Sequence, residues 1–77
     1  VNIYPNPAQT DLNIDLTNRE GDIINLDVID INGKLVLSTS FNTTKYVLDV
    51  NDITAGTYLI RLRSEKAAYY KKVVILK

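Results

Sequence analysis

The chain has 77 residues, 45% of them apolar, with nine basic and nine acidic side chains and neither cysteine nor histidine. This length fits one domain, and the apolar share is too high for a disordered segment. The missing cysteine excludes a disulfide framework and thiolate metal sites, and the missing histidine removes the commonest general base and the commonest metal ligand.

The first third of the chain alternates apolar and polar residues in short runs, which is the period of half-buried β-strands. Strands are therefore expected over 1–4, 12–16 and 24–28, and the polar, glycine-containing stretch 18–22 is expected to be a turn. Pro5 and Pro7 follow the first run. Because proline fixes its φ angle and has no N–H to donate, regular pairing should stop there and the chain should form a stiff corner.

A hairpin is expected at Asn32-Gly33, between two runs rich in β-branched and aliphatic residues. Both residues can take the positive φ angles that a two-residue hairpin turn requires. On the returning strand, Leu35, Leu37 and Phe41 are expected to point toward the core, because they are apolar residues at odd positions of one alternating run.

The second half of the chain continues the same pattern. Strands are expected over 46–50, 57–63 and 69–77, with connections over 42–45, 51–56 and 64–68. About seven short strands at regular spacing predict an all-β sandwich whose strands are mostly antiparallel.

The last run, KKVVILK, is rich in β-branched residues and carries lysines on both sides. Such a strand can lie at the edge of a sheet, where its backbone groups are free to pair with another chain. An ordinary sandwich strand whose lysines discourage aggregation fits equally well, so both interpretations stay open.

Charge is unevenly distributed although it sums to zero. Positions 1–55 hold three basic and eight acidic residues, a net charge of −5, whereas positions 56–77 hold six basic residues and one acidic residue, a net charge of +5. Such asymmetry can mark an interaction end. We prefer the simpler interpretation that basic strands lie beside acidic ones and that the charges pair across the sheet.

Nothing in the sequence points to catalysis. Serine occurs at positions 38, 40 and 64, but there is no histidine to activate it and no G-x-S-x-G motif. Asp27 with Asp30, and Asp49 with Asp52, bring carboxylates close in sequence, but so small a domain has little room for a cleft that holds two of them at a fixed separation. We expect the chain not to be an enzyme and to need no cofactor.

The patterns for metal binding and modification are also weak. Asp27, Asp30, Asn32 and Gly33 offer oxygen atoms near a turn, but position 28 is valine and the glutamate that would complete a calcium loop does not follow. A hairpin with solvated carboxylates is preferred, and no metal is expected. Asn42 begins an N-x-[ST] glycosylation pattern in a loop, for which an ordinary polar loop is the alternative.

Nucleic-acid binding is not expected either. Cations do lie near aromatic rings late in the chain, at Arg61, Arg63, Lys71, Lys72, Tyr58, Tyr69 and Tyr70. However, alternation places Tyr58 on the opposite face of its strand from the two arginines, and the front of the chain is strongly acidic. No apolar run approaches the length of a membrane span, so stable membrane insertion is not expected.

Four motifs stand in order along the chain: Y-P-N-P followed by an alternating strand, D-x-x-G-K, I-x-x-G-x-Y, and a short basic and apolar strand at the end. Their residues are Tyr4, Pro5, Asn6, Pro7, Asp30, Gly33, Lys34, Ile53, Gly56, Tyr58 and Lys72–Lys77. Together they resemble the type A C-terminal sorting domain of the type IX (Por) secretion system of Bacteroidota, in which the third motif begins with leucine where this chain has Ile53. The resemblance covers essentially the whole chain.

The resemblance implies an Ig-like β-sandwich over residues 1–77, a single C-terminal sorting domain excised from a larger secreted protein. It implies that an outer-membrane translocon reads the domain, that a sortase-like surface peptidase then removes it, and that the fused N-terminal cargo is released or joined to an anionic lipopolysaccharide. The cargo would pass through the periplasm to the cell surface or the medium.

Recognition in the family that the chain resembles is tied most closely to the last strand. Carried over, this strand is Lys72, Val73, Val74, Ile75, Leu76 and Lys77. The remaining motif positions are expected to be structural, and they are Tyr4, Pro5, Asn6, Pro7, Gly33, Lys34, Gly56 and Tyr58.

Two other functions stay open. A structural or carbohydrate-binding β-sandwich appended to an enzyme usually displays two or three aromatic residues on one face. Tyr69 and Tyr70 are adjacent, so in a strand they point to opposite faces and cannot form such a platform together. The other alternative is a self-assembling domain that pairs its edge strands.

Overall fold

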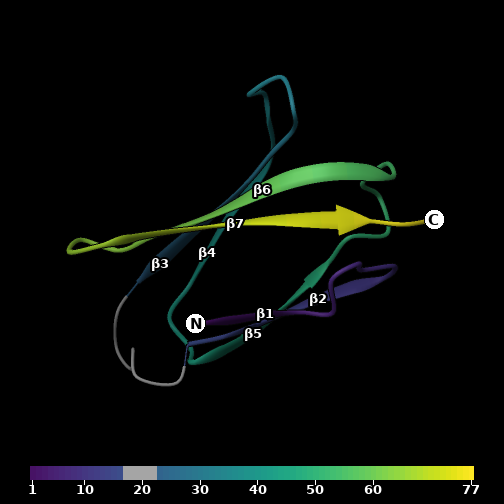
Figure 1. Cartoon of the computed structure of the whole chain (residues 1–77). Helices are drawn as coiled ribbons and strands as arrows, with labels where there is room; N and C mark the ends of the chain where they lie inside the picture. Colours follow the sequence, from purple (N-terminus) through teal and green to yellow (C-terminus); the bar gives the residue numbers. More distant parts are fainter. Residues whose placement is uncertain (17–22) are drawn as a thin grey trace.

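The computed structural model describes residues 1–16 and 23–77, and in these residues the chain forms seven strands (Figure 1). They are β1 (Asn2–Tyr4), β2 (Asp11–Asp15), β3 (Ile24–Ile29), β4 (Leu35–Phe41), β5 (Lys45–Asp49), β6 (Gly56–Arg63) and β7 (Ala68–Ile75). The turn expected over 18–22 lies outside the described residues. The described part of the chain has no helix long and apolar enough to cross a membrane.

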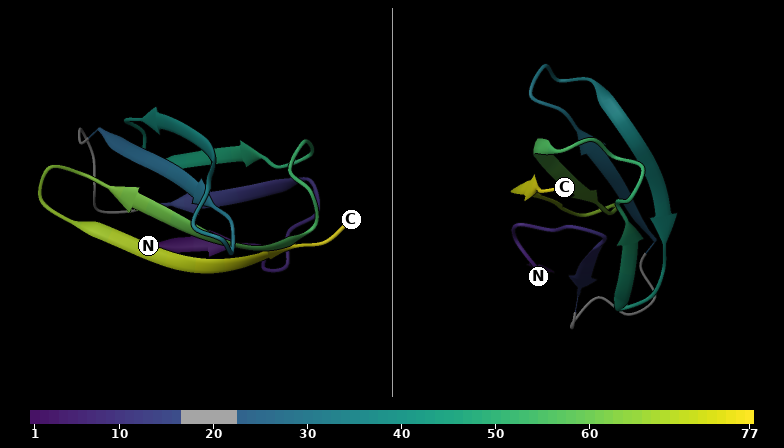
Figure 2. Two further views of the ribbon diagram at one scale, coloured as in Figure 1. Left: turned by 90° about the horizontal axis from the view of Figure 1, so that it is seen from above. Right: turned by 90° about the vertical axis from the view of Figure 1, so that its right-hand side faces the viewer.

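The strands form two sheets that pack face to face (Figure 2). One sheet has the order β1-β2-β5 and the other β4-β3-β6-β7, and neighbouring strands in both are antiparallel. The all-β, Ig-like sandwich expected from the alternating runs is therefore confirmed. The consecutive strands β1 and β2, β3 and β4, and β6 and β7 are paired, whereas the chain passes from one sheet to the other between β2 and β3, between β4 and β5 and between β5 and β6.

The core lies between the two sheets and is built from alternate residues of the strands, with Ala8, Leu16, Val50 and Ile53 added from the segments between them. Its members are Ile3, Ala8, Leu12, Ile14, Leu16, Ile24, Leu26, Val28, Phe41, Leu48, Val50, Ile53, Tyr58, Ile60, Leu62, Val73 and Ile75. Each aliphatic side chain buried in this way stabilises the fold by about 1.5–3 kcal/mol relative to exposure. Phe41 also stacks on Tyr46, with ring centroids 4.4 Å apart and ring planes within 7° of parallel.

The β3–β4 hairpin is confirmed, but the prediction of a two-residue turn was wrong. Only Gly33 of the loop has a positive φ angle, 83°, and Asn32 does not. The Gly33 N–H donates to the Asp30 carbonyl at 3.0 Å, and the Asp30 N–H donates to the Lys34 carbonyl at 2.9 Å, so the loop has three residues. The Asp30 carboxylate accepts the N–H groups of Asn32 and Lys34, both at 2.9 Å, and thereby stabilises this longer turn.

Leu35 does not point toward the core as predicted, since 52% of it is exposed. The register between β3 and β4 shifts: Val28 pairs with Leu37, but Ile29 pairs with Leu35, so Val36 is an extra residue. A bulge of this kind re-aims the side chains beyond it. Leu37, on the other side of the shift, is half-buried against the core as expected.

Candidate functional site at the two ends of the chain

The last strand lies at the edge of the four-stranded sheet. β7 pairs with β6 from Ala68 opposite Arg63 to Ile75 opposite Gly56. The expected position at a sheet edge is therefore confirmed. The strand ends at Ile75, two residues before the expected end at Lys77.

The six C-terminal residues divide into a buried and an exposed set. Val73 and Ile75 are 0% and 1% exposed and belong to the core. Lys72, Leu76 and Lys77 are exposed, and Val74 is half-buried on the outer face of the sheet. A partner that contacts the folded domain at this strand therefore meets the exposed set, whereas the buried set holds the two sheets together.

Asn6, between the two prolines, contacts the outer edge of β7 through its side chain. Its Nδ2 donates to the Lys72 carbonyl at 3.3 Å, and the Val74 N–H donates to its Oδ1 at 3.0 Å. A primary amide presents one donor and one acceptor side by side, as a peptide group does. The side chain of Asn6 thus replaces a stretch of neighbouring strand at this edge.

Ala8 continues this contact with its backbone. Its N–H donates to the Val74 carbonyl at 2.9 Å, and the Leu76 N–H donates to its carbonyl at 2.8 Å. The pairing is a single parallel bridge to Ile75, and Ala8 is fully buried, with 0% of it exposed. We call residues Asn6–Ala8 the N-terminal latch.

The latch was missed from the sequence. Pairing with β2 does stop at Tyr4, as the prolines predicted, and Pro5 and Pro7 are exposed. In the sequence the prolines and the expected recognition strand stand at opposite ends, but the fold brings the two ends together. The only local signal was a polar residue with a backbone-like amide between two residues that cannot donate an N–H.

Lys77 fastens the end of the chain to two further segments. Its ammonium group donates to the carbonyls of Val50 at 2.8 Å, Asn51 at 3.0 Å and Gln9 at 3.3 Å. These three bonds use the full donor capacity of an ammonium group. The C-terminus is therefore held against the connection that leads from β5 to β6 and against the segment that follows the latch.

Gly56 and Tyr58 lie beside the end of β7. Gly56, opposite Ile75, has a φ angle of 156°, which L side chains rarely adopt. Tyr58 is buried, and its hydroxyl donates to the Thr54 carbonyl at 2.7 Å and lies 3.0 Å from the Thr54 Oγ1. This motif therefore shapes the start of β6, whereas Gly33 and Lys34 lie in the β3–β4 hairpin.

Asp27 is the buried charged group of the core strands, and it lies on the outer face of β3. Only 2% of Asp27 is exposed. Its Oδ2 lies 2.9 Å from both the Nε and the Nη2 of Arg61 and 3.0 Å from the Nη2 of Arg63. Its Oδ1 accepts the Ser38 hydroxyl at 2.8 Å. The acidic front of the chain thus pairs here with its basic end, as the preferred interpretation of the charge asymmetry predicted.

The environment of Asp27 lowers the pKa of its carboxyl group. Burial by itself raises this pKa, but the hydrogen bonds from Ser38 and Arg61 and the charges of Arg63 and Arg61 outweigh burial. A carboxyl group with a pKa lower in the folded than in the unfolded state stabilises the fold above its unfolded pKa, about 3.9. That stabilisation is lost as the pH falls through the folded value.

We therefore expect the difference in unfolding free energy between wild type and Asp27→Asn to be constant above about pH 5 and to shrink as the pH falls below about 4. Urea denaturation of both proteins between pH 7 and pH 2 measures this difference. A difference that does not change with pH would show that ionisation of Asp27 does not contribute to stability.

The residues of the possible metal-binding and nucleic-acid-binding patterns have other contacts in the structure. The Asp30 carboxylate is bonded to the hairpin backbone and the Asp27 carboxylate to arginines, and the described residues hold no group of three side chains of the metal-binding types. Tyr58 is buried in the core, on the opposite face of β6 from Arg61, as expected. Tyr69 packs against the core while Tyr70 is 54% exposed, so these two rings do not share a face.

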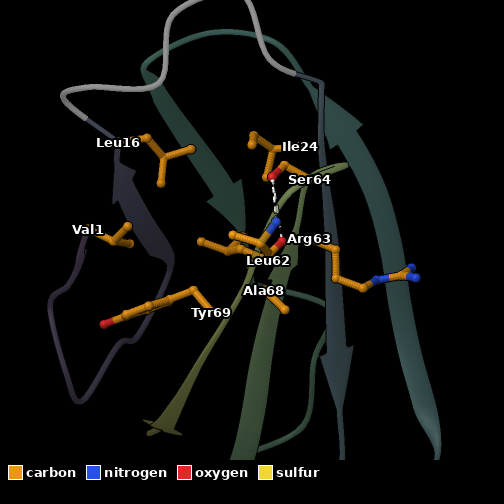
Figure 3. Close-up of a pocket in the computed structure, with 9 residues that line it drawn as sticks. Val1, Leu16, Ile24, Leu62, Arg63, Ser64, Ala68 and Tyr69 are labelled. Carbon is orange, nitrogen blue, oxygen red and sulfur yellow. Dashed lines mark hydrogen bonds between the residues drawn. The ribbon is translucent and has the colours of Figure 1, made fainter.

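Hollows on the described surface are small or open. Figure 3 shows one at the end of the sandwich, where the side chains of Val1, Leu16 and Leu62 gather and Arg63 points away. Its volume of about 20 Å³ is roughly that of one water molecule, far below the 300 Å³ or more of ligand pockets. An open groove of about 350 Å³ lies at the latch, between Pro5, Pro7, Gln9, Thr10, Asp11, Asn13 and Leu76.

Two comparisons with known proteins found similarities to this chain. A family model described as a secretion system C-terminal sorting domain matches residues 2–76. The fold is similar to part of PorZ, an essential bacterial surface component of the type-IX secretion system of Porphyromonas gingivalis, with a TM-score of 0.78 and 19% sequence identity. The similarity covers 100% of this chain and 11% of that chain, and at this identity it shows the fold alone. No curated protein matches.

Proposed function

Because the chain belongs to the family of type IX secretion system C-terminal sorting domains, we propose that it is the export module at the C-terminus of a larger secreted protein. In this proposal residues 1–77 follow a cargo domain, and the outer-membrane translocon recognises them as the cargo leaves the periplasm. The chain acts as a ligand and substrate of the export machinery, not as a catalyst, and it needs no cofactor.

One observation carries the site of recognition: the last strand lies at a sheet edge and presents Lys72, Val74 and Leu76 outward. An edge strand offers a partner its outward side chains, and here also the backbone groups of the part of β7 that the latch does not cover. We propose that the exposed set of the final six residues is what the translocon contacts. Val73 and Ile75, which are buried, would act only by maintaining the fold.

Substitution of the exposed residues tests this proposal. Lys72→Ala with Leu76→Ala in the full-length parent protein is expected to lower the exported fraction at least fivefold and to accumulate cargo in the periplasm. Lys45→Ala with Val47→Ala is the matched control, because it removes one lysine and one exposed aliphatic residue from another edge strand, β5. Immunoblots of periplasm, cell surface and medium measure the distribution. Normal export of the β7 variant would contradict the proposal.

We further propose that a sortase-like surface peptidase removes the domain after export, so that the cargo is released or joined to an anionic lipopolysaccharide. The compact fold and the family membership support a domain that can be removed as one unit. Mass spectrometry of the exported cargo is expected to find it without residues 1–77. Recovery of the surface or medium form with the domain still attached would contradict removal without affecting the proposed export role.

A further inference from the structure

The edge of β7 is not free along its last residues, because the latch occupies it. Four backbone groups there have partners: the carbonyls of Lys72 and Val74 and the N–H groups of Val74 and Leu76. Asn6 and Ala8 supply all four partners. Farther up β7, toward Ala68, no strand of the described residues pairs with this edge.

Asn6 can bond to the edge of β7 through its side chain, whereas the prolines on either side of it have no N–H to donate. Pro5 and Pro7 have no N–H, so the backbone of the Y-P-N-P segment cannot form a regular ladder with β7. The side-chain amide of Asn6 supplies a donor, which the prolines lack, and an acceptor directly beside it. An alanine would supply neither, and an aspartate would keep the acceptor for the Val74 N–H but lose the donor.

The latch also joins the two ends of the chain into one surface. Figure 2 shows the purple segment that follows β1 lying next to the yellow end of β7. Pro5, Pro7 and Leu76 line the same groove. The exposed residues of the last strand are therefore presented together with the Y-P-N-P segment, in a geometry that depends on the bonds of Asn6.

We infer that Asn6 is a positioning residue for export: its amide holds the outer edge of β7, so that Lys72, Val74 and Leu76 reach the translocon in one fixed arrangement. This inference rests on the proposed function. According to this inference, the Y-P-N-P segment near the start of the sequence supports recognition of the strand at its end. Asn6 acts through the strand that it holds and need not touch the translocon.

The test combines amide hydrogen exchange with export. In Asn6→Ala the Val74 amide is expected to exchange at least tenfold faster than in wild type, while amides of β2 keep their rates. Asn6→Asp is expected to restore much of the protection of Val74, since it keeps the acceptor.

Asn2→Ala is the local control, because Asn2 is exposed on β1. In the full-length parent, Asn6→Ala is expected to lower export at least threefold and Asn2→Ala to leave it unchanged.

A stability-matched variant separates positioning from a general loss of stability. Ile14→Val removes one methylene group from the core far along the chain from β7 and lowers the urea midpoint without altering the latch. If Asn6→Ala is exported no worse than Ile14→Val at an equal midpoint, the positioning role is overturned. Unchanged exchange of Val74 in Asn6→Ala, or in Asn6→Asp relative to Asn6→Ala, overturns the latch itself. Neither result contradicts the proposed function, which depends on Lys72 and Leu76.

Discussion

Deletion of Lys72–Lys77 is expected to abolish folding of the domain and not merely to remove a signal. The deletion takes Val73 and Ile75, which are 0% and 1% exposed, out of the core. Truncation of one such side chain typically costs about 2–5 kcal/mol. A domain of 77 residues is stable by only about 4–12 kcal/mol in total. The deletion also leaves the first half of β6 without a neighbour on one side and the latch without its partner.

Circular dichroism and urea denaturation measure this effect. Residues 1–71 are expected to show no cooperative transition, whereas the whole chain shows one. A shorter deletion of Leu76 and Lys77 is the control, since it keeps Val73 and Ile75 and should remain folded with a lower urea midpoint. A sharp transition in residues 1–71 would show that the core does not need the last strand.

This expectation bears on how export experiments are designed. If the six-residue deletion unfolds the domain, retention of such a cargo in the periplasm reports unfolding and recognition together. Substitution of Lys72 and Leu76, which are exposed, leaves the core intact and isolates recognition. The pair of surface substitutions is therefore a more direct test of recognition than the six-residue deletion.

Replacement of both Arg61 and Arg63 by methionine is expected to destabilise the domain by about 3 kcal/mol at neutral pH. Methionine keeps much of the cover over Asp27 but removes both of its counter-charges, which leaves a 2%-exposed carboxylate with only the Ser38 hydroxyl. A buried charge without its partner is among the costliest defects of a fold.

A third substitution tests the cause. Adding Asp27→Val to the two methionines is expected to recover most of the lost stability, because an apolar cluster of similar volume can replace a buried ion pair. Lys45→Met with Lys66→Met removes two charges from exposed positions and serves as the control, with an expected change below about 0.5 kcal/mol. If the arginine double variant loses less than about 1 kcal/mol, Asp27 does not depend on these two partners.

Most of the fold could be predicted from local patterns. The alternation of apolar and polar residues located all seven strands and most of their inward side chains, since a period of two is a property of the strand itself. The same argument separated Tyr69 from Tyr70 and Tyr58 from Arg61. Alternation failed at Leu35, where a register shift against β3 re-aims the chain. The Asn32-Gly33 pair located the β3–β4 turn but not its length, because the Asp30 side chain favours a loop one residue longer than expected.

The sequence by itself determined the all-β class, the faces of the strands and the four ordered motifs that indicate the family. Only the tertiary structure decided that β7 is an edge strand, that Asp27 pairs with Arg61 and Arg63, and that Asn6 reaches Val74, 68 residues away. The physical reason is that the alternation of apolar and polar residues depends only on residues that are neighbours in the sequence. The pairing of distant segments depends instead on how the two sheets stack, and that brings the opening Y-P-N-P segment against the last strand.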